Sequence, residues 1–191
     1  MEIQEDYYRS TCRTVIGEIE TALLAVDAQQ VERFINDLLT ADKVFFIGVG
    51  RVMLSLKAFA KRLAHLGVDA HCVGDITEPA ITDKDILIVG SGSGESIVPL
   101  AIAKKAKEIG VKKIIHIGSN MNGSMSNYAD YMVRIPVKTK LNLLDEIDSA
   151  QIMTSLFEQS LLVIGDVVAK MIAEECGINI ENLRHRHANL E

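Results

Sequence analysis

The feature that most constrains the fold is a regular alternation of short apolar runs with longer segments of helical spacing. The apolar runs are predicted strands at 44–47, 70–73, 86–89, 114–117 and 131–135. Short continuous apolar runs are typical of strands covered on both faces in a parallel sheet. The chain is therefore predicted to be an α/β protein, a single-domain doubly wound α/β/α sandwich with a five-stranded parallel sheet.

Segments with helical spacing are predicted at 4–26, 28–40, 52–66, 95–109 and 149–175. Asp148 and Gln151 resemble a capping box at the start of the last of these helices. The 191 residues suit one well-cored domain, and the N-terminal helices 4–40 and the tail 176–191 are expected to belong to it. The one long irregular connection is 136–149, and such loops are often functional.

Charge and composition exclude several classes of protein. With 26 acidic and 20 basic residues the net charge is −6, which opposes non-specific nucleic-acid binding. The three cysteines, Cys12, Cys72 and Cys176, form no CxxC pair, so a reducing compartment is expected. The acidic N-terminus lacks the apolar run of a signal peptide, and no uncharged apolar stretch reaches the ~18 residues of a membrane span. We expect a soluble cytoplasmic protein without nucleic-acid or membrane partners.

A loop rich in serine and glycine follows the third predicted strand and opens a helix. Its hydroxyls come from Ser91, Ser93 and Ser96, and Gly92 and Gly94 let a ligand approach the backbone closely. Backbone N–H groups at a helix N-terminus form a ready site for an anion. The loop contains no Lys, which excludes a Walker-type nucleotide site and favours a phosphate monoester. The alternative is that Ser93 or Ser96 only caps the helix.

A second glycine loop, 48–53, follows the first predicted strand. Gly50 and Arg51 lie in it, and a guanidinium at that position can bind phosphate or sugar hydroxyls. The alternative for Arg51 is an exposed side chain with weak ion pairs. The loop also resembles a GxGxxG dinucleotide motif, with Met53 in place of the last glycine. Two acids follow at about the spacing that a ribose contact needs, Asp69 and Asp75.

The last predicted helix is apolar on most sides but carries one polar stripe within an arc of about 100°. The stripe consists of Gln151, Ser155, Glu158, Gln159 and Asp166. Such a stripe faces solvent, a partner or a cleft. If it faces a cleft, Glu158 at its centre is a candidate general base. The alternative is a stripe that simply faces solvent.

The tail carries His185 and His187 two residues apart. This spacing could supply two metal ligands, but no Cys, Asp or further His cluster completes a site in the sequence. We therefore predict no metal, and a frayed basic tail is the alternative.

The serine loop 91–96 resembles the phosphosugar-binding loop of the SIS (sugar isomerase) family. Further segments resemble the single-domain 6-phospho-3-hexuloisomerases of that family, and together they extend the similarity over nearly the whole chain. These segments are 57–63, 65–67, 74–75 with Pro79, 155–159 and 187–191.

The resemblance implies a homo-oligomer, a dimer or tetramer with sites shared between subunits, that converts 3-hexulose 6-phosphate to fructose 6-phosphate without a cofactor. The three loop serines would hold the phosphate, and Glu158 would transfer the proton through an enediol or enediolate. His187 would be a catalytic residue that reaches the site of a neighbouring subunit.

Several positions depart from the family pattern. Val52 and Met53 stand where Ser-Gly is typical, Glu78 replaces Thr, and Thr154 replaces the Gly of a Pro-Met-Gly sequence. These positions are expected to contact the sugar, so they affect the substrate more than the reaction. Two alternatives therefore remain: a non-catalytic module that senses phosphosugars, and an isomerase of another sugar phosphate such as arabinose 5-phosphate.

Overall fold

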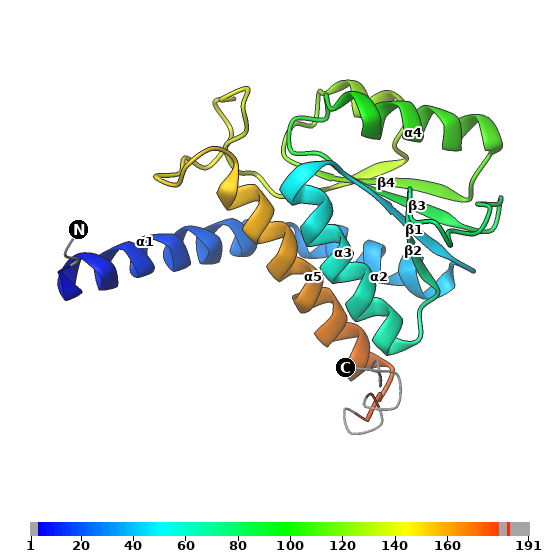
Figure 1. Ribbon diagram of the computed structural model, residues 1–191, viewed down its shortest axis with the longest axis horizontal. Coiled ribbons are helices and arrows are strands. Elements are labelled where there is room, and N and C mark those ends of the chain that lie inside the picture. Colours follow the sequence, from blue (N-terminus) through cyan, green and yellow to red (C-terminus); the bar gives the residue numbers. More distant parts are fainter. Residues whose placement is uncertain (1–3, 180–182, 184–191) are drawn as a thin grey trace.

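Five parallel strands form the central sheet of the computed structural model, which describes residues 4–179 and residue 183 (Figure 1). Their order in the sheet is β2-β1-β3-β4-β5. The strands are β1 (Val44–Ile47), β2 (Ala70–Cys72), β3 (Ile86–Gly90), β4 (Lys113–Gly118) and β5 (Tyr131–Arg134). The predicted fold class and the five strands are confirmed.

The strand order places a switch point between β1 and β3. After β1 the chain moves outward to β2, and it then returns to the other side of β1 to form β3. The register aligns Ile47 with Val89, so the two strands end side by side. The loops that follow them therefore diverge at the carboxyl edge of the sheet, where ligands bind in open α/β sheets.

Helices cover both faces of the sheet (Figure 1). The helices are α1 (Glu5–Leu24), α2 (Ala28–Thr40), α3 (Gly50–Leu66), α4 (Ile97–Ile109) and α5 (Ser155–Glu175), with a 3₁₀ helix η1 at Ser124–Asn127. Helices α2, α3 and α5 pack on one face, and α4 lies on the opposite face. Helix α1 packs against α5 through its C-terminal part, while its N-terminal part extends away from the body.

The packing of α3 against α5 fixes the first turns of both helices near the sheet edge. Phe59 lies against the backbone of Gly165, and a Cβ at that glycine would come within 2.8 Å of the ring. Only glycine therefore permits this close approach. Leu63, Leu161 and Val168 complete a fully buried contact between the helices.

The N-terminus of α5 corrects one prediction. The predicted helix 149–175 begins at Ser155 instead, and Asp148 does not cap it. Lys138 Nζ donates a hydrogen bond to Asp148 Oδ1 over 2.7 Å. Residues 149–151 are not helical because three of their donors bind the carboxylate of Glu18 in α1. These tertiary hydrogen bonds override the local capping signal.

Among residues 4–179, no helix is both long and apolar enough to cross a bilayer.

Candidate functional site

A cavity of about 280 Å³ opens at the switch point of the sheet. Its walls come from the loops after β1 and β3, from the segment after β5 and from the first turn of α5. It is lined by Val49, Gly50, Arg51, Val52, Gly90, Ser91, Gly92, Ser93, Ser96, Thr139, Lys140, Thr154, Phe157 and Glu158. The cavity thus contains most of the side chains that were predicted to form a site.

The carbonyl groups of the serine loop point away from this cavity. Each of the four from residues 91–94 accepts a hydrogen bond from a residue that does not line it. The donors are His116 Nε2 to Ser91 O (2.7 Å), Ser119 N and Asn120 N to Gly92 O (2.9 and 3.1 Å), Asn120 Nδ2 to Ser93 O (3.1 Å) and Met125 N to Gly94 O (3.1 Å). The negative ends of the peptide dipoles are therefore directed away from the position of a bound anion.

The donors of the loop remain available to a ligand. Within the part of the chain that the structure describes, the N–H groups of Gly92, Ser93 and Ser96 donate to no protein group. Ser91 Oγ and Ser96 Oγ lie 3.2 Å apart, and the side chains of Ser91 and Ser93 are buried. Amides and hydroxyls gathered at the start of α4 form an anion cradle that needs no cation within the loop.

The capping alternative does not describe Ser96. It is the residue before α4, yet its side chain makes no capping hydrogen bond. Ser93 Oγ accepts from Glu95 N over 3.3 Å, which is a turn contact outside the helix. Helix α4 instead starts with Pro99 in its first turn, where a missing N–H costs nothing.

His116 supports the serine loop through a hydrogen bond to the Ser91 carbonyl, on the side away from the cavity. It lies on β4, and burial lowers the pKa of its imidazole to about 4. The ring is therefore neutral near pH 7, and its Nε2–H donates to the Ser91 carbonyl. The ring passes so close to Gly118 that a Cβ there would lie 2.3 Å from Nε2. Glycine at this position is thus required for the ring to reach the loop.

Glu95, inside the loop sequence, faces the protein instead of the cavity. Its carboxylate accepts from Ser124 N (2.6 Å) and Ser124 Oγ (2.7 Å). These hydrogen bonds lower the pKa of Glu95. The charge of Glu95 is therefore used to hold η1 against the loop, and it does not point at the anion cradle.

Glu158 lies in the first turn of α5, which supplies a further part of the cavity wall. Its side chain is 11% exposed. Arg51 Nε donates to Glu158 Oε2, and Thr154 Oγ1 donates to Oε1 over 2.8 Å. Ser55 Oγ holds the backbone carbonyl of Glu158 over 2.8 Å. Two donors, one of them the predicted Arg51, therefore hold the carboxylate of the predicted base, and Ser55 holds its backbone.

Glycines allow the walls of the cavity to come together. A Cβ at Gly92 would lie 3.2 Å from the methyl group of Thr139 and 3.4 Å from the ring of Phe157. Gly50 opens α3 with φ +58°, and Gly94 has φ +70°. Side chains rarely adopt this left-handed conformation, so both loops depend on glycine there.

The structure brings together all but two of the predicted site residues. Gly94 lies behind the serine loop, against Gly123 and His116, and does not line the cavity. His187 and His185 lie outside the described residues, so the role of His187 stays a prediction. Of the polar stripe on the last helix, only Glu158 lines the cavity.

The departures from the family pattern fall in different places. Val52 and Thr154 line the cavity, whereas Glu78 lies elsewhere and accepts from Gly74 N. The two acids considered for a dinucleotide also lie elsewhere. Asp69 pairs with His71, and Asp75 pairs with Lys57.

Two polar residues of the cavity were not predicted. Thr139 and Lys140 come from the irregular connection after β5, which the sequence marked as long but without a motif. Their role could not be read from the sequence because they face the cavity only through the fold of the loop. Among the described residues, no three His, Cys, Asp or Glu side chains are grouped so that they could hold a metal ion.

Comparison with known proteins places the chain in a family. Residues 37–164 match the model of the SIS domain. The chain is 34% identical to a 3-hexulose-6-phosphate isomerase of Bacillus subtilis, over 93% of this chain and 95% of the relative. It is 36% identical to a protein of the same name from Mycobacterium gastri, over 93% of this chain and 88% of that one.

A solved structure agrees with these matches. The structure of this chain superimposes with a TM-score of 0.81 on that of a protein of Methanococcus jannaschii. From that crystal structure a function of 3-hexulose-6-phosphate isomerase was inferred for the M. jannaschii protein. It is 30% identical, and the alignment covers 95% of this chain and 99% of that one. The resemblance seen in the sequence is therefore confirmed.

Proposed function

Because this chain belongs to the SIS domain family, we propose that it is a sugar-phosphate isomerase. One observation carries the proposal: the anion cradle of the serine loop and the carboxylate of Glu158 face one cavity. The cradle suits a phosphate, and a fixed carboxylate suits proton transfer at a carbon some distance from that phosphate. The relatives named 3-hexulose-6-phosphate isomerase support fructose 6-phosphate and 3-hexulose 6-phosphate as the sugar pair.

The geometry suggests the course of the reaction. Ser91, Ser93 and Ser96 bind the phosphate, so binding energy from this remote group orients the reacting carbons. Glu158 removes a proton from the carbon beside the carbonyl, which forms an enediolate. The same carboxyl then returns the proton to the neighbouring carbon, while a proton moves between the two oxygens. Arg51, which contacts Glu158, stabilises negative charge that develops on these oxygens.

This sequence of steps needs no redox partner, since only protons move and the electrons stay within the sugar. We therefore propose that the enzyme works without a cofactor. The thiols of Cys12, Cys72 and Cys176 are unpaired, which supports the proposal that it works in the cytoplasm.

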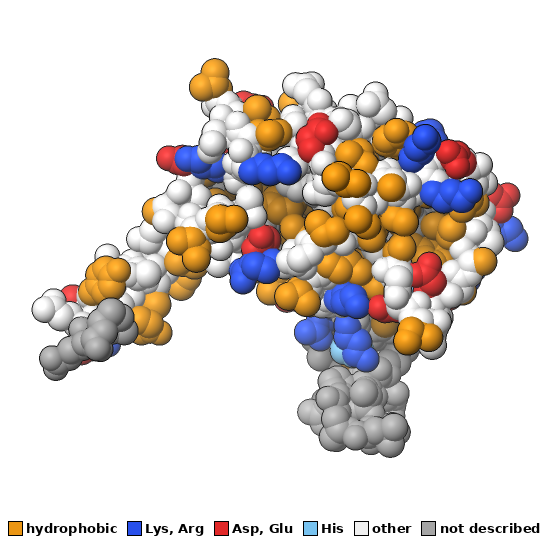
Figure 2. Space-filling model, turned by 45° about the horizontal axis from the view of Figure 1, so that its top comes forward, with side chains coloured by type: hydrophobic (Ala, Val, Ile, Leu, Met, Phe, Trp, Pro, Cys, Tyr) orange, Lys and Arg blue, Asp and Glu red, His pale blue; other side chains and the backbone are white. Residues whose placement is uncertain are grey.

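We also propose that the protein is a homo-oligomer. The N-terminal part of α1 leaves the body and carries exposed apolar side chains (Figures 1 and 2). Tyr7 is 70% exposed, Tyr8 62% and Ile16 65%. A closed assembly would bury this surface. It would also allow His187 of one subunit to serve the site of another, which is the role proposed for that residue.

Deuterium exchange tests the proposed activity. The protein is incubated in D₂O with fructose 6-phosphate, arabinose 5-phosphate or inorganic phosphate, and proton NMR follows the signals beside the carbonyl. Thermal shift with the same compounds reports binding. Fructose 6-phosphate is expected to raise the melting temperature, exchange deuterium and form a 3-ketose.

Glu158→Gln should retain binding and lose exchange, and Glu20→Gln, at an exposed position on α1, is the matched control. Binding without exchange in the unaltered protein would instead favour a phosphosugar sensor. Exchange with arabinose 5-phosphate alone would name a different substrate. Full turnover in Glu158→Gln would remove that residue from the mechanism.

A further inference from the structure

The cavity is lined by charged side chains of which only some form an ion pair with each other. Its ionisable side chains are Arg51, Lys140 and Glu158. Arg51 and Glu158 contact each other, so their charges largely cancel. Lys140 forms no ion pair within 4 Å among the described residues, although its charge adds slightly to the hydrogen bonds of Ser124 that lower the pKa of Glu95. It is therefore the cavity's available positive charge, although the serine loop itself contains no cation.

Lys140 projects from a loop, residues 137–147, that is closed at its base. Val137 and Ile147 form a parallel β-bridge. Lys138 N donates to Ile147 O over 2.8 Å, and Ile147 N donates to Pro136 O over 2.7 Å. The loop is thus a compact unit in which Lys140 has a defined place.

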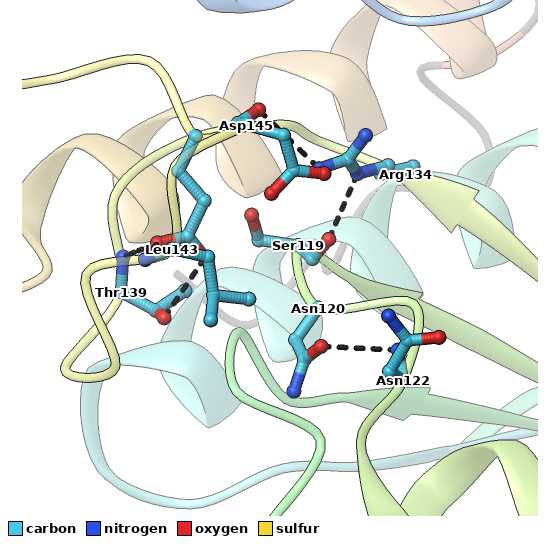
Figure 3. A network of polar contacts seen from close by, with 8 residues as sticks. Ser119, Asn120, Asn122, Arg134, Thr139, Leu143 and Asp145 are labelled. Atoms are coloured by element: carbon cyan, nitrogen blue, oxygen red, sulfur yellow. Dashed lines mark hydrogen bonds and ion pairs between the residues drawn. The ribbon is translucent and has the colours of Figure 1, made fainter.

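A carboxylate inside the loop organises its tip. Glu146 accepts from Thr139 Oγ1 (2.9 Å), Thr139 N (3.1 Å) and Leu143 N (3.0 Å). These contacts occupy the Glu146 carboxylate with two backbone N–H groups and one hydroxyl of its own loop, and Glu146 forms no ion pair with Lys140 within 4 Å. Figure 3 shows Thr139 and Leu143 side by side in this arrangement.

The 137–147 loop is also tied to the serine loop by a chain of polar contacts. Arg134 Nε donates to Ser119 O over 2.9 Å, and its NH2 group donates to Asp145 Oδ2 over 2.5 Å (Figure 3). Ser119 N and Asn120 N in turn donate to the carbonyl of Gly92. The loop that carries Lys140 and the loop that carries the serines are therefore held by the same residues after β4.

The 137–147 loop also contacts the serine loop directly. The methyl group of Thr139 packs over Gly92, and it lies 3.2 Å from the position of a Cβ there. Lys140 follows Thr139 directly and lines the same cavity as Ser91 and Ser96. A dianionic phosphate in the cradle would thus lie beside an ammonium group that forms no ion pair within 4 Å with any described acid.

We propose that Lys140 is a phosphate-binding residue that supplies the counter-charge which the serine loop lacks. The inference rests on the proposed function only in taking the ligand to be a phosphate ester. In this arrangement the serine loop gives directional hydrogen bonds, and Lys140 gives long-range attraction that draws an anion into an acidic protein. Lys140 touches the remote phosphate and not the reacting carbons, so it determines affinity more than turnover.

Binding measurements on matched variants test this role. Lys140→Met is compared with Lys138→Met, because Lys138 lies in the same loop but pairs with Asp148 and does not line the cavity. Titration calorimetry with inorganic phosphate and with fructose 6-phosphate gives the Kd of each variant. Lys140→Met should raise both Kd values about tenfold, and Lys138→Met should change them less than about twofold.

Salt dependence adds a measurement that a purely structural role would not change. The Kd of the unaltered protein should rise more steeply with NaCl concentration than that of Lys140→Met, since one charge contact has been removed. Lys140→Arg should restore most of the affinity. Melting temperatures without ligand should be equal in all three variants.

The outcomes separate this inference from the proposed function. Equal Kd values for Lys140→Met and Lys138→Met, in a protein that binds phosphate, would overturn the role of Lys140. Absence of isomerisation would overturn the proposed activity and leave the binding comparison intact. A tenfold loss with a kcat that is unchanged would support both.

Discussion

The guanidinium group of Arg51 and the carboxylate of Glu158 form an ion pair that joins the first turn of α3 to the first turn of α5. The Arg51 side chain is 63% exposed and the Glu158 side chain only 11%. An exposed cation thus holds a largely buried acid at the wall of the cavity. The contact costs little stability to break, because solvent screens the arginine. Its value lies in the orientation of the carboxylate.

Arg51→Ala should therefore lower kcat much more than it lowers the melting temperature. A reacting group displaced by about 1 Å can lose about 100-fold in rate, so we expect a decrease of about 10- to 100-fold. Steady-state kinetics and thermal unfolding measure the two effects. Arg62→Ala is the control, because Arg62 pairs with Asp166 between the same two helices, away from the cavity. Equal kcat values in the two variants would contradict the orienting role.

Thr154→Val tests the second donor to the same carboxylate. The substitution keeps the shape of the side chain but removes the hydroxyl that donates to Glu158 Oε1 over 2.8 Å. A hydrogen bond to a charged group is worth about 1.5–3 kcal/mol, so kcat should fall about 10- to 100-fold. Thr154→Ser should retain the hydroxyl and most of the activity. If Val and Ser variants have the same kcat, the hydroxyl does not orient Glu158.

The neutral imidazole of His116 predicts a loss of stability in acid. Its pKa is about 4 in the folded protein and 6.5 in the unfolded chain, so the unfolded state binds the additional proton first. The contribution of His116 to the free energy of unfolding should be constant above pH 6.5. It should fall by up to about 3 kcal/mol as the pH approaches 4.

Urea unfolding at several pH values measures this effect. Other carboxyl groups titrate in the same range, so the useful quantity is the difference from His116→Gln, which can still donate to Ser91 O. The variant should show a shallower decline in stability between pH 6.5 and pH 4. Parallel declines in both proteins would show that His116 does not contribute.

Gly118→Ala should displace the serine loop, because the added methyl group would collide with two groups that hold the loop in place. A Cβ at this position would lie 2.3 Å from His116 Nε2 and 2.6 Å from Ser91 O, and the second of these is a backbone atom. Overpacking of this kind costs about 1–3 kcal/mol in stability. Because the displaced carbonyl belongs to Ser91 and its movement would shift the neighbouring donors of the cradle, phosphate affinity should decrease as well.

Gly17→Ala provides the comparison for that substitution. Gly17 lies inside α1, with no atom within 4 Å of the position of a Cβ. Alanine should stabilise this helix by about 0.5–1 kcal/mol and leave ligand binding unchanged. Thermal unfolding and phosphate titration distinguish the two variants. A neutral Gly118→Ala would mean that the loop tolerates displacement.

The strands and the serine loop could be predicted because their signals are local. A buried strand is a continuous apolar run, and the cradle needs hydroxyls and glycines at adjacent positions. Glu158 was found from the periodicity of its helix. The start of α5 was predicted wrongly because Glu18, far away in the sequence, binds residues 149–151.

The remaining parts of the site depend on contacts that sequence spacing does not contain. The pairing of Arg51 with Glu158 joins residues that are distant in the chain, and it follows from the crossing of α3 and α5. Lys140 enters the cavity because Glu146 and Arg134 fold the loop in which it lies. His116 reads in the sequence as an ordinary strand residue, although it supports the cradle.

The β-bridge between Val137 and Ile147 means that the 137–147 loop leaves the body and rejoins it at adjacent points. A segment closed at its own base can change in length or composition at little cost in chain entropy. Changes confined to 141–144, between the contact of Thr139 with Gly92 and that of Asp145 with Arg134, would leave the register of the sheet and the serine loop unaffected. Divergence of ligand affinity can therefore proceed by replacement within this one segment, and the same boundary is a natural junction for grafting loops between related proteins.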